Sequence, residues 1–318
     1  MKAAVRSKYG SQDVLSIQEI ETPTPKANEV LIKVYATTVN RTDCGILLGK
    51  PKFIRLFSGL PNPRFATTGS DFAGQIEAVG SEVKSFKAGD KVMGFAGMGC
   101  SSHAQYLTIK AKEIITIPGN ITYDQAVACM EGAFYAYSSV VELKPKPGQK
   151  VLVNGGTGAI GSSCIQFLKL HGTNITAVCN GENAELVRSL GADKIIDYKT
   201  QDFTKDTEKY DVVVDAVGKS TFAKCKHLLK KKGIYTSTDG LENFLLRFIT
   251  PLFGGKKVLF SMPTNIPGYL IFIKDLLEKG RFKPVIDKKR YSLDKIAEAY
   301  KYVLTGQKIG NVILTMDV

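Results

Sequence analysis

The sequence predicts an α/β protein built around a doubly wound parallel sheet. Between residues 151 and 238, short runs rich in β-branched residues alternate with stretches whose apolar residues recur at helical spacing. At the head of this alternation, the strand Val151–Asn154 enters a glycine-rich turn and then an apolar helix, Ala159–Leu170. Such a sheet binds its ligands at the carboxyl ends of its strands.

The turn carries three glycines at G-x-G-x-x-G spacing. The first allows a tight turn, the second lets a pyrophosphate approach the backbone, and the third lets the helix pack on the strand. The free amides of the first helical turn then face an anion. The sequence therefore predicts a dinucleotide-binding turn made of Gly156, Thr157, Gly158, Ala159, Ile160 and Gly161.

The bulk properties are those of an ordinary globular protein. A length of 318 residues suggests about two domains, and 44% hydrophobic residues are enough for a large core. There is no run of about 18 apolar residues, so we expect no transmembrane helix. The N-terminus resembles a first strand and not a signal sequence, which favours the cytoplasm. The six cysteines are scattered without a C-x-x-C pair and are expected to be buried thiols.

The net charge of +13 has two interpretations. It could steer a polyanion, or it could be a solvated basic surface without a specific partner. We favour the second because the lysines are spread along the chain. The densest run, Lys224–Lys232, is expected at the end of a helix, where cations are favourable.

Residues 1 to about 120 are rich in predicted strands. Val30–Ala36 and Gln75–Gly80 carry β-branched residues, and glycine and proline mark turns between strands. Short strands at close spacing predict a small barrel-like domain. Within it, the apolar segment Pro51–Leu60 is either core or the lining of a binding mouth.

From Thr122 the pattern becomes helical, with a long helix Tyr123–Glu142 broken by Gly132. The very apolar segment Leu241–Phe253 is too short to span a bilayer. We favour a lid or a dimer-contact helix there over a segment that binds a membrane surface. The remaining predicted strands are Asn174–Cys179, Lys194–Tyr198, Asp211–Val217, Gly233–Thr238, one near Val258–Met262, and a closing strand Asn311–Thr315.

The strand ends favour NADPH over NADH. An NAD site places an acidic residue at the end of the second strand, but here that end is Cys179 and Asn180. Asn180 can donate to a 2′-phosphate. The third strand lies beside the second, so Tyr198 and Lys199 at its end are expected to contact the same ribose. Alternatively, Tyr198 simply packs on the adenine.

Together, several motifs give the chain a family resemblance. They are Val39–Asp43, Thr68–Gly74, Gly89–Val92, the Gly156–Gly161 turn, Ser189–Asp193 and Val214–Gly218. With them the whole chain resembles the zinc-free quinone oxidoreductase branch of the medium-chain dehydrogenase/reductase superfamily. The resemblance implies a GroES-like β-barrel catalytic domain (residues 1–120 and 264–318), a Rossmann-type NADPH-binding domain (residues 121–263), and a homodimer.

The resemblance also bears on zinc. Relatives that hold zinc have Cys, Gly-His-Glu and a later Cys, where this chain has Asn40, Gly69-Ser70-Asp71 and the region of Cys129. Asn40 and Ser70 are poor zinc ligands. We therefore predict no metal, and hydride transfer from NADPH to a small apolar quinone or α,β-unsaturated carbonyl, whose own conjugation spreads the developing charge.

The resemblance suggests the catalytic residues. Asn40 would donate to the substrate carbonyl, Asp43 would orient that loop, and Thr42 would contact substrate or phosphate; Asp43 could also be a helix cap. Val217 and Gly218 would lie over the nicotinamide ribose through their backbone. Glu131 could be an acid in the cleft, although we favour a solvated side chain.

Two other functions stay open. The chain could be a non-catalytic NADPH-binding adaptor, or an RNA-binding or membrane-associated protein; a zinc alcohol dehydrogenase is the weakest alternative. Specific nucleic-acid binding is not expected, because Trp is absent and the lysines are dispersed. The sequence does not identify the acceptor.

Overall fold

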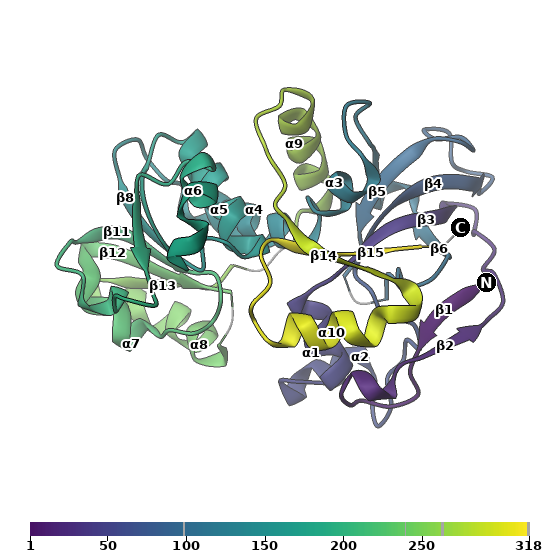
Figure 1. Cartoon of the computed structure of the whole chain (residues 1–318), viewed down its shortest axis with the longest axis horizontal. Helices are drawn as coiled ribbons and strands as arrows, with labels where there is room; N and C mark the ends of the chain where they lie inside the picture. The colour runs from purple at the N-terminus through teal and green to yellow at the C-terminus, as the bar shows by residue number, and fades with distance from the viewer. Residues whose placement is uncertain (98, 239, 262–263, 317–318) are drawn as a thin grey trace. The chain divides into compact units, whose positions relative to one another are not determined.

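The computed structural model describes residues 1–97, 99–238, 240–261 and 264–316. The chain divides into two compact units, Met1–Glu131 with Ile266–Val318, and Gly132–Asn265 (Figure 1). Each unit has its own sheet. Among the described residues, no helix combines the length and the apolar character needed to cross a membrane.

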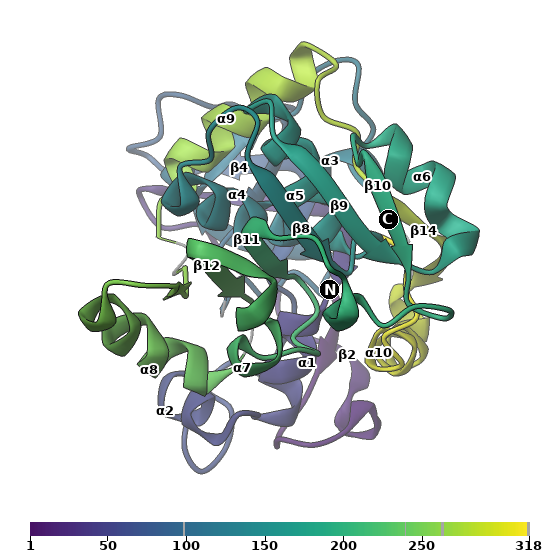
Figure 2. The same ribbon diagram turned by 90° about the vertical axis from the view of Figure 1, so that its left-hand side faces the viewer.

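The sheet of the unit Gly132–Asn265 has six parallel strands in the order β10-β9-β8-β11-β12-β13 (Figure 2). The doubly wound order predicted from the sequence is confirmed. Buried residues run almost continuously along β8 and β9, as expected for strands covered on both faces. The strands are β8 (Lys150–Asn154), β9 (Asn174–Cys179), β10 (Lys194–Asp197), β11 (Tyr210–Asp215), β12 (Leu229–Ser237) and β13 (Lys257–Leu259).

Helix α4 leads into β8, and the other helices of this unit connect the strands. Nine residues of α5, from Ala159 to Leu168, are buried, which explains why its sequence is so apolar. The main helices are α4 (Glu131–Leu143), α5 (Ala159–Leu170), α6 (Ala184–Ser189), α7 (Phe222–Cys225) and α8 (Leu241–Ile249). The short 3-10 turns are η4 (Gly181–Asn183), η5 (Phe203–Lys205), η6 (Lys226–Leu228) and η7 (Thr250–Phe253).

The other unit holds a seven-stranded sheet in the order β14-β15-β3-β4-β5-β7, with β6 on β3, and a hairpin of β1 and β2. The eleven residues of β3 pair with three strands, so β3 organises the sheet. The strands are β1 (Lys2–Val5), β2 (Ser16–Glu19), β3 (Glu29–Val39), β4 (Asp71–Val79), β5 (Lys91–Phe95), β6 (Tyr106–Lys110), β7 (Ile114–Thr116), β14 (Ile286–Ser292) and β15 (Asn311–Thr315).

Helix α10 contributes Tyr300 and Val303 to the core of this unit, which also holds Phe72 and Val312. The helices are α1 (Arg41–Leu48), α2 (Arg55–Ser58), α3 (Tyr123–Val127), α9 (Ile266–Glu278) and α10 (Ile296–Leu304). The 3-10 turns are η1 (Gln12–Val14), η2 (Lys52–Ile54), η3 (Ala111–Glu113) and η8 (Leu293–Lys295).

Three expectations need correction. The predicted helix Tyr123–Glu142 is two helices that separate before Gly132, and α3 packs on β3, β4 and β5 in the first unit. Gly132 instead lies in the first turn of α4, where a Cβ would come within 2.6 Å of the Ala159 Cβ. The helix end expected at Lys224–Lys232 covers only the first part of the run: Lys224 and Lys226 lie in the last turns of α7 and η6, whereas the last three lysines lie in β12. The predicted strand near Val258 ends at Leu259, and Met262 lies outside the described residues.

Candidate functional site

The glycine turn follows β8. Gly155 adopts φ +87°, a left-handed conformation that glycine reaches without strain, and α5 begins at Ala159 with Gly158 as its N-cap. Because Gly158 has no side chain to cap the helix, the first N–H groups of α5 are left for an anion. Gly155 is one residue that the spacing motif missed, although it makes the turn.

The backbone at this turn is too close for side chains. A Cβ on Gly161 would lie 2.1 Å from the Gly155 carbonyl oxygen, and one on Gly156 would lie 3.2 Å from the Ala177 Cβ. A Cβ on Gly158 would be 3.5 Å from the same oxygen, an ordinary contact. Gly161 is therefore needed for helix packing, whereas Gly158 leaves open space above the turn. Both fit a pyrophosphate cradle.

A buried pair of polar residues holds the next loop at the carboxyl ends of β8 and β11. The Asn154 Nδ2 donates to Asp215 Oδ1 at 3.0 Å. Asp215 also accepts from the backbone N–H groups of Val217 (3.3 Å) and Ser220 (2.8 Å). This fixes the loop that contains Val217 and Gly218. The sequence signal for Asp215 was its position at a strand end, but the role of Asn154 was missed.

The residues predicted to bind a 2′-phosphate contact a carboxylate instead. Glu182 accepts from the Asn180 amide at 2.9 Å and from Lys199 Nζ at 3.1 Å. The hydrogen bond from Lys199 lowers the pKa of Glu182. Tyr198 is 59% exposed at the end of β10. The structure therefore brings Asn180 and Lys199 together as expected, but with Glu182 between them.

In the other unit, Asn40 caps α1. Its Oδ1 accepts from the Asp43 N–H at 2.8 Å, and Asp43 Oδ2 accepts from the Asn40 N–H at 3.2 Å. This reciprocal capping box makes Asn40 the cap and Asp43 the third helical residue, so the interpretation of Asp43 as the cap was wrong. The role of Asp43 in orienting that loop for catalysis stays a prediction.

The Asn40 side chain has no N–H group left for a substrate. Its Nδ2 donates to Ser70 Oγ at 2.8 Å and to Thr38 Oγ1 at 3.2 Å, and the residue is 4% exposed. An amide has two N–H donors, and both are occupied here. The geometry thus gives Asn40 a positioning role and argues against its predicted role as a donor to the substrate carbonyl.

Asp71 and His103 complete this buried polar cluster. Asp71 accepts from the Thr38 N–H (2.9 Å) and hydroxyl (2.7 Å), and burial raises its pKa to about 6. His103 Nε2 lies 2.9 Å from the Thr38 carbonyl, and its Nδ1 lies 2.8 Å from the Thr68 hydroxyl. Burial lowers the pKa of His103 to about 4, so the ring is neutral. The sequence reasoning did not single out His103.

Glu131 is buried at the start of α4. It is 4% exposed, so the expectation of a solvated side chain was wrong. Thr42 Oγ1 donates to Glu131 Oε1 at 2.5 Å. Burial raises the pKa of Glu131 to about 7, although the Thr42 hydrogen bond opposes this. A carboxyl with this pKa is partly protonated at neutral pH and can give up a proton.

The residues at the zinc positions do not fit zinc. Asn40 and Ser70 hydrogen-bond to each other, and the Cys129 thiol donates to the Gln125 carbonyl at 3.1 Å. Burial raises the pKa of the Cys129 thiol, which therefore stays protonated in this hydrogen bond. Over the described part of the chain, no three His, Cys, Asp or Glu side chains gather as a metal site would require.

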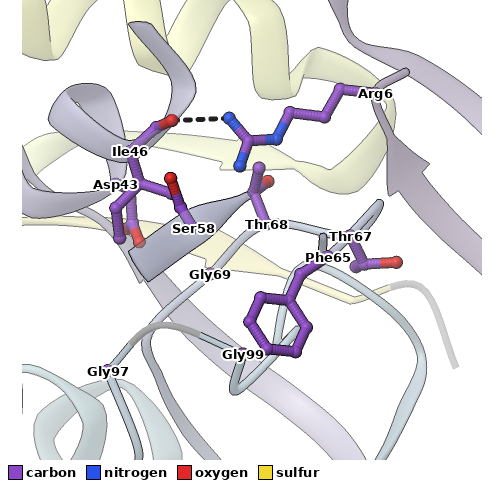
Figure 3. Close-up of a pocket in the computed structure, with 10 residues that line it drawn as sticks. All are labelled: Arg6, Asp43, Ile46, Ser58, Phe65, Thr67, Thr68, Gly69, Gly97 and Gly99. Atoms are coloured by element: carbon purple, nitrogen blue, oxygen red, sulfur yellow. Dashed lines mark hydrogen bonds between the residues drawn. The ribbon is translucent and has the colours of Figure 1, made fainter. Parts of the chain in front are cut away.

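A cavity of about 10 Å³ lies beneath α1 (Figure 3). Arg6 borders it and donates through Nη1 to the Ile46 carbonyl at 2.6 Å, and Asp43 and Thr68 line it. A volume of this size accommodates about one water molecule. The cavity is therefore too small for a quinone or an enone.

The segment Pro51–Leu60 is not core. It forms η2 and α2, and four of its large apolar side chains are 46% to 71% exposed: Phe53, Leu56, Phe57 and Leu60. The interpretation of this segment as part of the core is therefore wrong. An apolar surface of this kind suits an apolar ligand.

The two units together define a class of protein, the nicotinamide-dependent oxidoreductases with a GroES-like domain. Residues 26–144 match the alcohol dehydrogenase GroES-like domain family, and residues 190–314 match the zinc-binding dehydrogenase family. The 2-methylene-furan-3-one reductase of Solanum lycopersicum is 32% identical over 99% of this chain and 79% of its own length. The NADPH-dependent alkenal/one oxidoreductase of Arabidopsis thaliana has the same identity and coverage.

Among solved structures, the quinone oxidoreductase from Coxiella burnetii superposes with a TM-score of 0.87 at 25% identity, covering 99% of each chain. With these relatives, the chain belongs to the medium-chain dehydrogenase/reductase superfamily, in its quinone oxidoreductase branch.

Proposed function

We propose that this protein is an NADPH-dependent reductase of quinones or α,β-unsaturated carbonyls that works without zinc. The observation that carries the proposal is the set of side chains at the zinc positions. Asn40 and Ser70 hydrogen-bond to each other there, so a zinc ion would lack two of the ligands it needs. An acceptor that spreads its own charge needs no metal, and relatives are named for such acceptors.

The glycine turn fits a dinucleotide. Gly156, Gly158 and Gly161 leave the backbone open at the N-terminus of α5, where Thr157, Ala159 and Ile160 would offer N–H groups to the pyrophosphate. Val217 and Gly218 would contact the nicotinamide ribose. When bound, NADPH supplies the hydride.

Asn180, Tyr198 and Lys199 would hold the 2′-phosphate of NADPH. For this, Lys199 must leave Glu182. That exchange costs little, because both side chains of the ion pair are more than half exposed. A phosphate with two negative charges then competes well with the single carboxylate of Glu182 for Lys199. The preference for NADPH over NADH depends on these three residues.

The Thr42–Glu131 pair would supply the proton. Reduction of a quinone or an enone consumes one hydride and one proton. Near pH 7 about half of the Glu131 carboxyls hold a proton. In that form the Glu131 O–H would donate to Thr42 Oγ1, reversing the 2.5 Å hydrogen bond, and the Thr42 O–H would turn to the substrate and give up its own proton there. The capping box of Asn40 and Asp43 keeps Thr42 in the first turn of α1.

The proposal is tested with protein purified without added metal. We expect NADPH oxidation with menadione or an alkenal, a much lower rate with NADH, and no loss after treatment with a chelator. Activity that appears only after zinc is added, or the absence of turnover with the whole acceptor panel despite tight NADPH binding, would contradict it. The second result would favour a non-catalytic NADPH-binding adaptor.

A homodimer and a cytoplasmic location stay predictions. Light scattering after size-exclusion chromatography would measure the mass of the particle against 34.7 kDa for one chain. Cell fractionation would test the location.

A further inference from the structure

Helix α8 buries a polar side chain and exposes apolar ones, although Leu246 packs against the core of this unit. Its inner face holds Asn243 (1% exposed) and the neighbouring Thr250 (7% exposed), whose hydroxyl accepts from the Val258 N–H at 2.9 Å. Its outer face carries Phe248 and Ile249 at 61% and 46% exposure. A helix of a globular protein normally buries its apolar face. The outer face of α8 therefore suits a partner that is itself apolar.

The exposure increases beyond the end of the helix. In η7, Leu252 and Phe253 are 81% and 80% exposed. Phe248 and Leu252 are four residues apart, and so are Ile249 and Phe253. We name these four residues the apolar tip. Two glycines, Gly254 and Gly255, follow it and lead into β13.

Lysines lie at the same end of the sheet as the apolar tip. Lys256 Nζ donates to the Lys226 carbonyl at 2.6 Å, which joins the segment after η7 to the turn before β12. In the register of β12 and β13, Ile234 lies opposite Lys257, so Lys232 precedes that pair at the same end of the sheet. We name these residues the lysine cluster: Lys224, Lys226, Lys230, Lys231, Lys232, Lys256 and Lys257.

Acidic residues do not balance this cluster. The segments 222–238 and 251–257 contain these seven lysines and no Asp or Glu. Asp211 pairs with Lys230 at 2.7 Å, and Lys256 is engaged with a carbonyl. The surface thus combines protruding apolar side chains with excess positive charge.

From this combination we propose that the apolar tip and the lysine cluster form a binding surface for membranes that contain anionic phospholipids. Exposed Phe and Leu side chains insert at the level of the headgroups, and lysines attract the anionic lipids around them. The proposal is independent of the reductase function. The surface lies at the amino ends of β12 and β13, whereas the dinucleotide turn lies at the carboxyl end of β8, so one ligand leaves the other site free.

The same geometry argues against the two roles that the sequence suggested for Leu241–Phe253, a dimer contact and a lid. A two-fold axis that passes through this surface would place one lysine cluster against the other, and like charges repel. A lid over the cofactor would have to cover the carboxyl ends of the strands, but η7 precedes the amino end of β13. A membrane with anionic lipids meets both the apolar and the charged requirement.

The test is co-sedimentation of the full chain with vesicles of phosphatidylcholine alone and with 30% phosphatidylserine. We expect binding to the anionic vesicles, a drop of at least tenfold in apparent affinity at 0.5 M NaCl, and little binding to neutral vesicles. The double variant Leu252→Ser/Phe253→Ser should bind the anionic vesicles with an apparent affinity at least tenfold lower than that of the parent. The double variant Lys231→Glu/Lys232→Glu should show a similar drop in apparent affinity for the anionic vesicles at low salt.

Matched controls separate this surface from general stickiness. Ile271→Ser removes an apolar side chain of α9 that is 67% exposed, and Lys110→Glu/Lys112→Glu reverses two exposed lysines on the other unit. Both should bind as the parent does, and all variants should keep NADPH binding and thermal stability. Equal vesicle binding by test and control variants would overturn the proposal. The proposal would also be overturned if the chain did not bind vesicles and instead formed a dimer that the substitutions Leu252→Ser/Phe253→Ser dissociate.

Discussion

The glycine turn and the buried polar cluster perform their roles in opposite ways. At the turn, Gly155 to Gly161 offer backbone atoms and open space, and added side-chain atoms would obstruct a ligand or the helix. Around Asn40, the side chains of Thr38, Ser70 and Asp43 are buried and hydrogen-bond to the Asn40 side chain or backbone. A backbone site depends on one local segment, whereas the polar cluster depends on β3, β4, α1 and α4 at once. Substitutions at the two sites should therefore fail differently.

The largest effect is expected for Gly161→Ala. The new Cβ would lie 2.1 Å from the Gly155 carbonyl, so the backbone of β8 and α5 must separate. We expect a loss of about 3 kcal/mol in unfolding free energy and about a hundredfold in kcat/KM for NADPH. Urea unfolding and steady-state kinetics would measure these.

Gly158→Ala sharpens this prediction. Its Cβ meets only an ordinary contact at 3.5 Å, so stability should hold while NADPH binding weakens. Gly119→Ala, whose Cβ meets nothing within 4 Å, is the control for both measurements. If Gly161→Ala left cofactor binding intact, the turn would not be the dinucleotide site.

The second effect is on catalysis by Glu131→Gln. Glutamine keeps the acceptor for Thr42 but carries no acidic proton. We expect kcat to fall roughly a hundredfold with little change in the KM for NADPH. The parent's kcat should fall as the pH rises through about 7, and the variant should lack this limb. A pH profile shared by both enzymes would exclude Glu131 as the proton donor.

The same variant should change stability with pH. Because burial raises the pKa of Glu131 from 4.5 to about 7, the folded protein holds this proton more tightly than the unfolded chain. The contribution of Glu131 to stability is then fully present below pH 4.5 and is lost as the pH rises through 7. Glu131→Gln should be more stable than the parent at pH 8 by roughly 3 kcal/mol, and not at pH 4. Unfolding in urea at the two pH values would show it.

A smaller effect is expected for Asn40→Ala. It removes the cap of α1 and should cost about 1 kcal/mol of unfolding free energy. Asn40→Asp keeps the oxygen that accepts from Asp43 but loses the donors to Ser70 and Thr38. If Asn40 only positions α1, both variants keep measurable turnover with menadione. Complete loss of turnover in a folded Asn40→Ala variant would instead restore its role as a substrate donor.

The smallest effects are expected at the strand ends of the nucleotide-binding unit. Glu182→Gln frees Lys199 and should lower the KM for NADPH a few-fold, since an exposed ion pair is weak. Tyr198→Ala should raise the KM for NADPH more than that for NADH. Equal changes for both cofactors would remove the basis for NADPH preference at this position.

Much of the fold could be predicted, because strands and helices follow from local spacing of apolar residues. The strands Asn174–Cys179 and Asn311–Thr315 were predicted with their observed bounds. The break between α3 and α4 was misplaced, since glycine usually interrupts a helix. Here Gly132 serves close packing against Ala159 instead, which no local pattern reveals.

The sequence by itself determined the glycine turn and the family of this protein. The turn is a backbone feature whose requirements appear as glycines at fixed spacing. Only the tertiary structure decided the burial of Glu131, the engagement of both Asn40 donors, and the exposed apolar side chains at the end of α8. Burial and pairing between distant segments set the charge and the available protons of a side chain. The sequence, in which Glu131 precedes a glycine, therefore suggested a solvated carboxylate, and only the fold shows that Glu131 is buried.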